Sequence, residues 1–76
     1  MKKELIICDP KILSGKPVVK GSRISVAFIL QCLASGMTID EILRGYPTLT
    51  YQGIIAALKY AASDFEGEET YSIEAK

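Results

Sequence analysis

The sequence contains no histidine, the side chain that enzymes most often use as a general base and that proteins most often use to hold a metal. The carboxylates Asp40 and Glu41 are adjacent in the sequence, so on a helix they point in different directions and do not converge on one site. Neither Cys8 nor Cys32 stands in a motif that would activate a nucleophile. We therefore predict that the protein is not an enzyme and uses no metal or cofactor.

Long apolar runs are also missing. The run from Leu5 to Cys8 is too short for the core of a signal peptide, which needs about seven to fifteen apolar residues. No stretch approaches the roughly 20 residues of a membrane span. The two cysteines match neither a disulfide framework nor a zinc spacing. We expect a cytoplasmic protein without a membrane segment, with Cys8 and Cys32 as reduced thiols in the core.

Charge is unevenly distributed along the chain, although the formal net charge is +0. Residues 1–63 hold eight Lys and Arg against four Asp and Glu, whereas residues 64–76 hold five acidic residues against one lysine. At 76 residues, 49% of them apolar, the chain is a globular domain whose small core stabilises it only marginally. The sequence predicts one domain over residues 1–63 and an acidic C-terminal tail over residues 64–76.

Two short extended segments open this domain. Residues 5–8 are apolar and β-prone, and a turn signal at residues 9–10 ends them. Residues 17–20 form a second β-prone stretch between Gly15 and Gly21. We predict a β hairpin or strand pair around a loop, with both glycines in left-handed turns.

Three helices follow in the pattern of apolar residues. Ser25 is placed to cap a helix whose apolar face reads Val26, Ile29, Leu30 and Leu33 and which ends at Gly36. Thr38 and Glu41 form a capping box for a second helix, whose face is Ile39, Ile42, Leu43 and Tyr46 before Pro47 ends it. Thr50 caps a third helix that runs to about Ser63, with the inward face Tyr51, Ile54, Ile55, Leu58 and Ala62.

A short capped helix, a connection of about four residues and a longer helix, all preceded by another helix, form the pattern of a helix-turn-helix. The sequence therefore predicts a mainly α protein, a three-helix bundle with a helix-turn-helix behind a short β element. The same pattern also occurs in helical bundles that bind no DNA.

DNA binding by this motif would place outward side chains of the third helix on base edges. Those positions are Gln52, Gly53, Ala56 and Lys59, with Thr50 at the cap. Phosphate contacts would come from Lys16, Lys20, Arg23, Arg44 and Thr48. For Arg23 a structural hydrogen bond to the preceding loop is an equal alternative to a DNA contact.

The acidic tail is a second candidate for binding. It alternates carboxylates with large apolar side chains, which suits a basic, apolar-lined cleft on a partner protein. The predicted partner-binding residues are Phe65, Glu66, Glu68, Glu69, Tyr71 and Ile73. The alternative is an acidic end without a partner.

An ordered set of motifs resembles one known family. The motifs are Asp9-Pro10, Gly15-Lys16-Pro17, Gly21-Ser22-Arg23-Ile24, the run from Gly36 to Leu43, the run from Tyr46 to Thr50, and the run from Ala56 to Ala61. Together they resemble the bacterial and archaeal family called domain of unknown function 433 over roughly residues 5–63. Ser22 departs from the usual Thr before the arginine, Gly53 places a weak helix former inside the third helix, and the tail lies outside the shared pattern.

This resemblance implies a homeodomain-like helix-turn-helix and a role as antitoxin of a type II toxin-antitoxin pair, whose toxin is a PIN-like ribonuclease. We accordingly expect an antitoxin-like regulator that binds operator DNA and a toxin protein. The alternative is a pure protein–protein interaction module without DNA binding. Because the strand at residues 5–8 would leave an unpaired edge, we also expect a homodimer.

Overall fold

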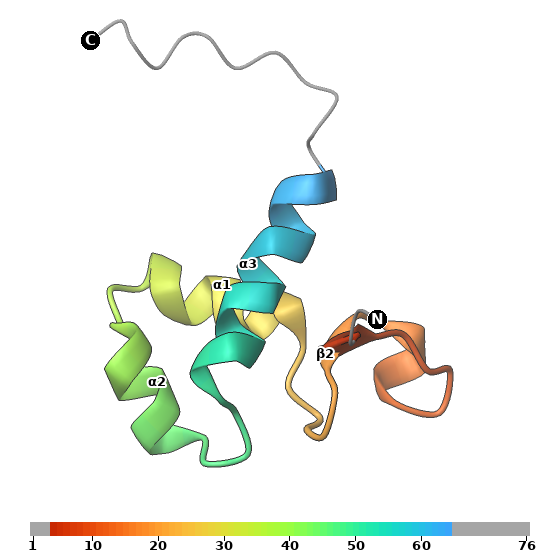
Figure 1. The fold of residues 1–76 in the computed structure, drawn as a ribbon, viewed down its shortest axis with the longest axis horizontal. Helices are drawn as coiled ribbons and strands as arrows, with labels where there is room; N and C mark the ends of the chain where they lie inside the picture. Colours follow the sequence, from red (N-terminus) through yellow and green to blue (C-terminus); the bar gives the residue numbers. More distant parts are fainter. Residues whose placement is uncertain (1–3, 65–76) are drawn as a thin grey trace, which may run out of the picture.

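The computed structural model describes residues 4–64, and the predicted partner-binding residues of the tail lie outside this range. Strand β1 (Ile6–Ile7) is followed by a 3-10 turn (Leu13–Gly15) and strand β2 (Val18–Val19). Helices α1 (Val26–Ala34), α2 (Ile39–Gly45) and α3 (Tyr51–Asp64) complete the fold. Helix α3 lies across α1, with α2 on one side and the N-terminal β arm on the other (Figure 1). The predicted class, mainly α with a short N-terminal strand pair, is confirmed.

The β arm forms as the two β-prone stretches predict. Strands β1 and β2 pair antiparallel, with Ile6 opposite Val19 and Ile7 opposite Val18. Gly15 and Gly21 both have a φ of 86°, which confirms the predicted left-handed turns. Beyond the prediction, Leu13 and Ser14 also have positive φ, so the turn between the strands holds three successive left-handed residues.

Each helix begins at its predicted cap. The Phe28 N–H donates to the Ser25 hydroxyl at 2.9 Å, and the Gly53 N–H donates to the Thr50 hydroxyl at 3.0 Å. At α2 both halves of the capping box are present: the Glu41 N–H donates to the Thr38 hydroxyl, and the Thr38 N–H donates to the Glu41 carboxylate. These caps fix the starts of the helices because they satisfy N–H groups that have no partner within the helix.

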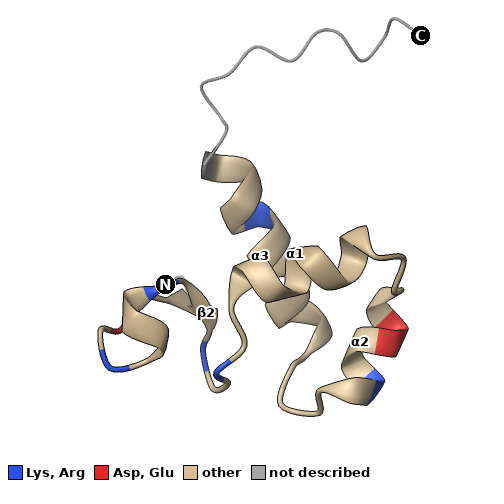
Figure 2. Ribbon diagram, turned by 180° about the vertical axis from the view of Figure 1, so that it is seen from behind, with Lys and Arg blue, Asp and Glu red and all other residues tan. Residues whose placement is uncertain are grey.

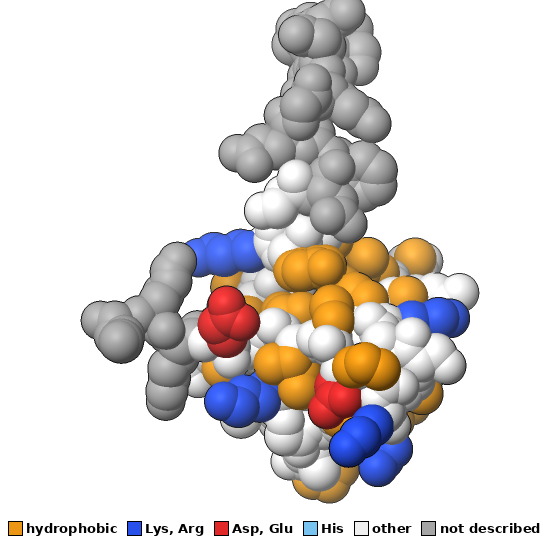
Figure 3. Space-filling view, turned by 90° about the vertical axis from the view of Figure 1, so that its right-hand side faces the viewer, with side chains coloured by type: hydrophobic (Ala, Val, Ile, Leu, Met, Phe, Trp, Pro, Cys, Tyr) orange, Lys and Arg blue, Asp and Glu red, His pale blue; other side chains and the backbone are white. Residues whose placement is uncertain are grey.

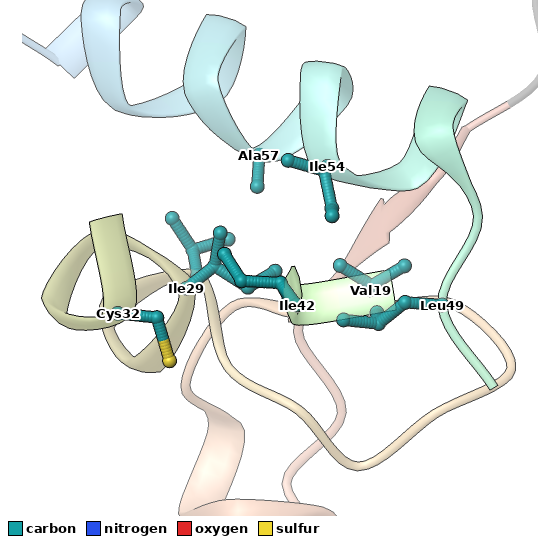
Figure 4. Close-up of a cluster of buried hydrophobic side chains, with 8 residues drawn as sticks. Val19, Ile29, Cys32, Ile42, Leu49, Ile54 and Ala57 are labelled. Carbon is teal, nitrogen blue, oxygen red and sulfur yellow. The ribbon is translucent and has the colours of Figure 1, made fainter. Parts of the chain in front are cut away.

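The core lies where the three helices and β2 meet. It contains Val19, Val26, Ile29, Cys32, Ile42, Leu49, Ile54 and Ala57 (Figure 4). Among the helices of residues 4–64, none has both the length and the apolar character that crossing a membrane requires.

Several predicted core positions are wrong. Tyr51 is 58% exposed and Ala62 is exposed, because α3 turns Gly53 and Ala57 toward the core together with Ile54, whose predicted burial is confirmed. Leu30 is 36% exposed, since α1 buries Cys32 one helical turn beyond Ile29. The prediction of two core thiols holds for Cys32 alone.

Cys8 is exposed because it lies beyond the end of β1, where the chain turns away from β2 toward the loop. Both thiols are free, as the spacing of the cysteines predicts.

Candidate nucleic-acid interface

Helices α2 and α3 with their connection form the helix-turn-helix unit. The Tyr46 N–H closes the last turn of α2 by donating to the Ile42 carbonyl at 2.9 Å, and Pro47 then prevents the helix from continuing. The Leu49 N–H donates back to the Tyr46 carbonyl at 2.9 Å, and the Leu49 side chain is buried in the core. This anchored connection holds Thr48 and Thr50 exposed at the start of α3.

Aromatic packing fixes the end of α2 from the other side. The rings of Phe28 and Tyr46 meet edge to face, with centroids 5.3 Å apart. This contact ties the connection to α1. The position of α3 relative to α2 therefore depends on a packed turn and not on the length of the connection alone.

All eight predicted DNA-binding side chains are exposed: Lys16, Lys20, Arg23, Arg44, Thr48, Thr50, Gln52 and Lys59. Within residues 4–64 none of the five cationic ones forms an ion pair. Their charges are thus available to a partner.

Four of these residues gather at one edge. Arg23 and Thr48 line a common groove of about 490 Å³ with Gly21 and Ser22, so the loop before α1 and the connection before α3 lie side by side. Figure 2 shows basic positions on that loop and on the last turn of α2 along the same lower edge. We call Lys20, Arg23, Arg44 and Thr48 the basic edge. The acidic first turn of α2, with Asp40 and Glu41, lies one turn from Arg44 on the same short helix (Figure 2).

The loop that carries Arg23 is held by its neighbour. The Ser22 hydroxyl donates to the Val19 carbonyl at 2.8 Å and accepts from the Ile24 N–H at 3.0 Å. Within the described part of the chain the Arg23 guanidinium makes no hydrogen bond. Of the two alternatives for Arg23, the structural bond to the loop is therefore absent, and Ser22 supplies that bond instead.

Replacing Ser22 by alanine is expected to destabilise the fold by about 1–2 kcal/mol, because two half-buried hydrogen bonds are lost. Ser22→Thr keeps the hydroxyl and should retain most of the stability. Urea unfolding of both variants measures this difference. Equal stability of the alanine and threonine variants would show that the hydroxyl does not hold the loop.

The outer face of α3 is the second part of the candidate interface. Tyr51, Gln52, Ile55, Ala56 and Lys59 line a groove of about 270 Å³, which Leu5 of the arm borders. We call these five helical residues the outer face. The prediction for Tyr51 failed because the apolar spacing of the third helix fits more than one inward face.

Gly53 is not on this outer face, contrary to the prediction from the helix pattern. It is buried, and a Cβ at this position would lie 3.0 Å from Val19 Cγ1. A larger residue here would require the Val19 side chain to shift by a few tenths of an ångström, so the close approach of β2 to α3 favours glycine. A glycine inside an otherwise regular helix was the signal in the sequence that this side packs closely.

Lys59 stands apart from the basic edge. It lies on α3 two turns beyond Gln52 and shares a further groove with Glu4 of the arm. In the view of Figure 3, two basic side chains adjoin at the lower right, and the others are separated from them by apolar, acidic and uncharged surface. The structure thus offers a few separate phosphate contacts. Within residues 4–64, no three Cys, Asp or Glu side chains gather as metal ligands would.

Comparison with known proteins decides the family. Residues 6–61 match the family model described as protein of unknown function, DUF433. The chain belongs to the DUF433 family. The matched region runs from β1 almost to the end of α3, so it includes the β arm and the helix-turn-helix.

Two relatives extend this result. The chain is similar to a DUF433 member protein from Anabaena variabilis of known crystal structure, with 27% identity and a TM-score of 0.75 over 82% of this chain and 61% of that one. It is 32% identical over 62 residues to an uncharacterized protein of Sinorhizobium fredii, y4eO, covering 82% of this chain. This DUF433 chain spans only 28% of that relative's length, so the two share one domain.

Proposed function

We propose that this DUF433 chain is a non-catalytic, antitoxin-like regulator that binds DNA through α2 and α3 and neutralises a partner ribonuclease. The DNA-binding half is supported by the helix-turn-helix geometry, with a capped α3 next to exposed cations. The toxin-binding half is supported by the family resemblance of the motifs and by the acidic composition of residues 64–76.

One observation gives the strongest support for the proposed DNA binding. Arg23 and Thr48 come from segments 25 positions apart, yet they line one groove beside the connection that leads into α3. Phosphate contacts from the flanks of a recognition helix fix how it sits in the major groove. The groove shared by Arg23 and Thr48 supports such a role for the basic edge, whose charges have no ion-pair partner within residues 4–64.

The antitoxin half is tested by co-expression with the protein encoded next to this chain. We expect a stable complex that relieves the growth arrest caused by the neighbour alone. A chain shortened by residues 65–76, which keeps α3 to its end at Asp64, should fold normally and lose this protection. A full-length control tests charge separately from length. It carries Glu66→Gln, Glu68→Gln and Glu69→Gln, so it keeps the tail and removes three of its charges.

Undiminished protection by the shortened chain would contradict the role of the tail. Failure of the full-length chain to bind any neighbouring protein would contradict the antitoxin role itself.

A homodimer belongs to the same proposal. Strand β2 pairs with β1 on one side and forms an isolated β-bridge on the other, between Val18 and Ser25. The open edge of the sheet in residues 4–64 is therefore on β1. A second copy pairing along β1 would cover that edge and place two α3 helices for successive major grooves. The mass of the purified chain in solution measures the oligomeric state, and a monomer would contradict this arrangement.

A pure protein-binding module is the second candidate, and one surface favours it. Leu13 is 45% exposed and Phe28 is 37% exposed, and both line a groove of about 330 Å³ with Arg23 and Tyr46. Exposed aromatic and arginine side chains around an apolar groove are typical of protein interfaces. Under this alternative, Phe28→Ser should weaken binding of the partner protein, and the unsubstituted chain should bind no duplex DNA.

A further inference from the structure

The side chains at the start of α3 differ in kind from those of the basic edge. Tyr51 and Gln52 are exposed in the first turn, and Ile55 is half-buried one turn later on the same outer face. Lys59 follows a further turn along, about 10 Å from Gln52 at the rise of an α-helix. The positions of α3 nearest its start therefore carry an amide, a phenol and an aliphatic group, and no cation.

This set matches one kind of base pair. In the major groove, guanine is read chiefly by arginine or lysine through its O6 and N7 acceptors, and these side chains are absent from the first turn of α3. Glutamine pairs with adenine N6 and N7, and apolar groups contact the thymine methyl. Gln52 provides the amide, and Ile55 with the Tyr51 ring provides apolar surface beside it.

The charges beside this face favour a duplex as its occupant. The outer face itself is mostly apolar, whereas the exposed cations Lys20 and Arg23 stand on the loop that packs beside the α3 connection. A duplex whose phosphates lay along the basic edge would have its base edges free to meet the start of α3. An apolar face flanked by unpaired cations suits this arrangement of backbone and bases.

We propose that the outer face of α3 selects A·T base pairs, with Gln52 pairing with adenine and Ile55 and Tyr51 contacting the methyl group of thymine. This inference rests on the proposed DNA binding. It assigns Tyr51 as a specificity-determining residue and names A·T-containing operators as the class of DNA recognised.

Selection of bound duplexes from a random pool tests the inference. We expect adjacent A·T pairs to be enriched in the bound fraction. In the selected duplex, replacing thymine by uracil removes the methyl group and should weaken binding about fourfold for each methyl contacted. Gln52→Ala should reduce the preference for adenine about five- to 150-fold, the range for a bidentate side chain–base pair.

Controls keep the outcomes distinct. Ser63→Ala, also exposed on α3 but at its far end, should leave the preference unchanged. Helix content by circular dichroism confirms that Gln52→Ala folds. Salt-dependent binding with no preference for A·T, or with G·C enriched, would overturn this inference and leave DNA binding intact. No salt-dependent binding to any duplex would overturn both this inference and the proposed DNA-binding function.

Discussion

Replacing Ile54 by alanine is expected to lower the free energy of unfolding by about 2–5 kcal/mol. Ile54 is 0% exposed and points from α3 into the core beside Ile42 and Ile29 (Figure 4). The shortened side chain leaves a cavity where α3 meets the other helices. Because small domains have only about 5–15 kcal/mol of stability in total, this one substitution removes a large part of it. Urea unfolding followed by helix content measures the loss.

The adjacent Ile55 supplies the matched control. It has the same side chain in the same helix, but it is half-buried and lines the outer groove with Gln52 and Lys59. Ile55→Ala should therefore cost clearly less stability than Ile54→Ala. Equal losses at the two positions would contradict the orientation of α3, and with it the assignment of Tyr51 and Gln52 to the outer face.

The double variant Lys20→Ala with Arg23→Ala is expected to bind duplex DNA about thirtyfold more weakly at 0.15 M salt, because each lost phosphate contact lowers the salt slope by about 0.9. Both side chains are exposed, so their removal should leave the fold intact. Fluorescence anisotropy of a labelled duplex across a salt series measures the affinity and the slope together.

Lys11→Ala is the control for charge. Lys11 is exposed in the β arm beside Asp9, whose carboxylate accepts the Lys11 backbone N–H at 2.9 Å. Lys11→Ala removes one positive charge, as each substitution of the double variant does, and it leaves the basic edge unchanged. An equal fall in slope per charge for Lys11→Ala would show that binding follows total charge, and would refute a specific role for Lys20 and Arg23.

Local signals in the sequence are sufficient for the elements of this fold. Ser25, Thr38 and Thr50 cap the three helices as predicted, because a cap depends on residues within one turn. The strand pair and the turns at Gly15 and Gly21 follow from short-range chemistry in the same way.

The orientation of α3 could not be obtained from helical spacing. Tyr51, Ile55 and Leu58 form as regular an apolar stripe as Ile54, Ala57 and Ala61, so spacing alone leaves the inward face open. The buried stripe is the one beside Gly53, where α3 approaches Val19 of β2 closely, and this approach joins residues far apart in the chain. Helical spacing does not reveal this approach, so the prediction places Tyr51 in the core although it belongs to the outer face.

The candidate site was predictable as a set of exposed side chains but not as an arrangement. Long polar residues outside an apolar stripe are normally exposed, and all eight predicted DNA-binding residues are. That Arg23 shares a groove with Thr48 depends on the packing of the loop before α1 against the α2–α3 connection. The role of Ser22 in holding that loop was likewise visible only in the structure.

The dependence of duplex binding on salt tests the central claim most directly. If four phosphates are contacted per monomer, the logarithm of the affinity should fall against the logarithm of salt concentration with a slope of about −3.6. A slope near this value that becomes shallower in the Lys20→Ala, Arg23→Ala variant would support DNA binding through the basic edge and α3. Absence of binding at low salt, or binding that does not respond to salt, would contradict the account.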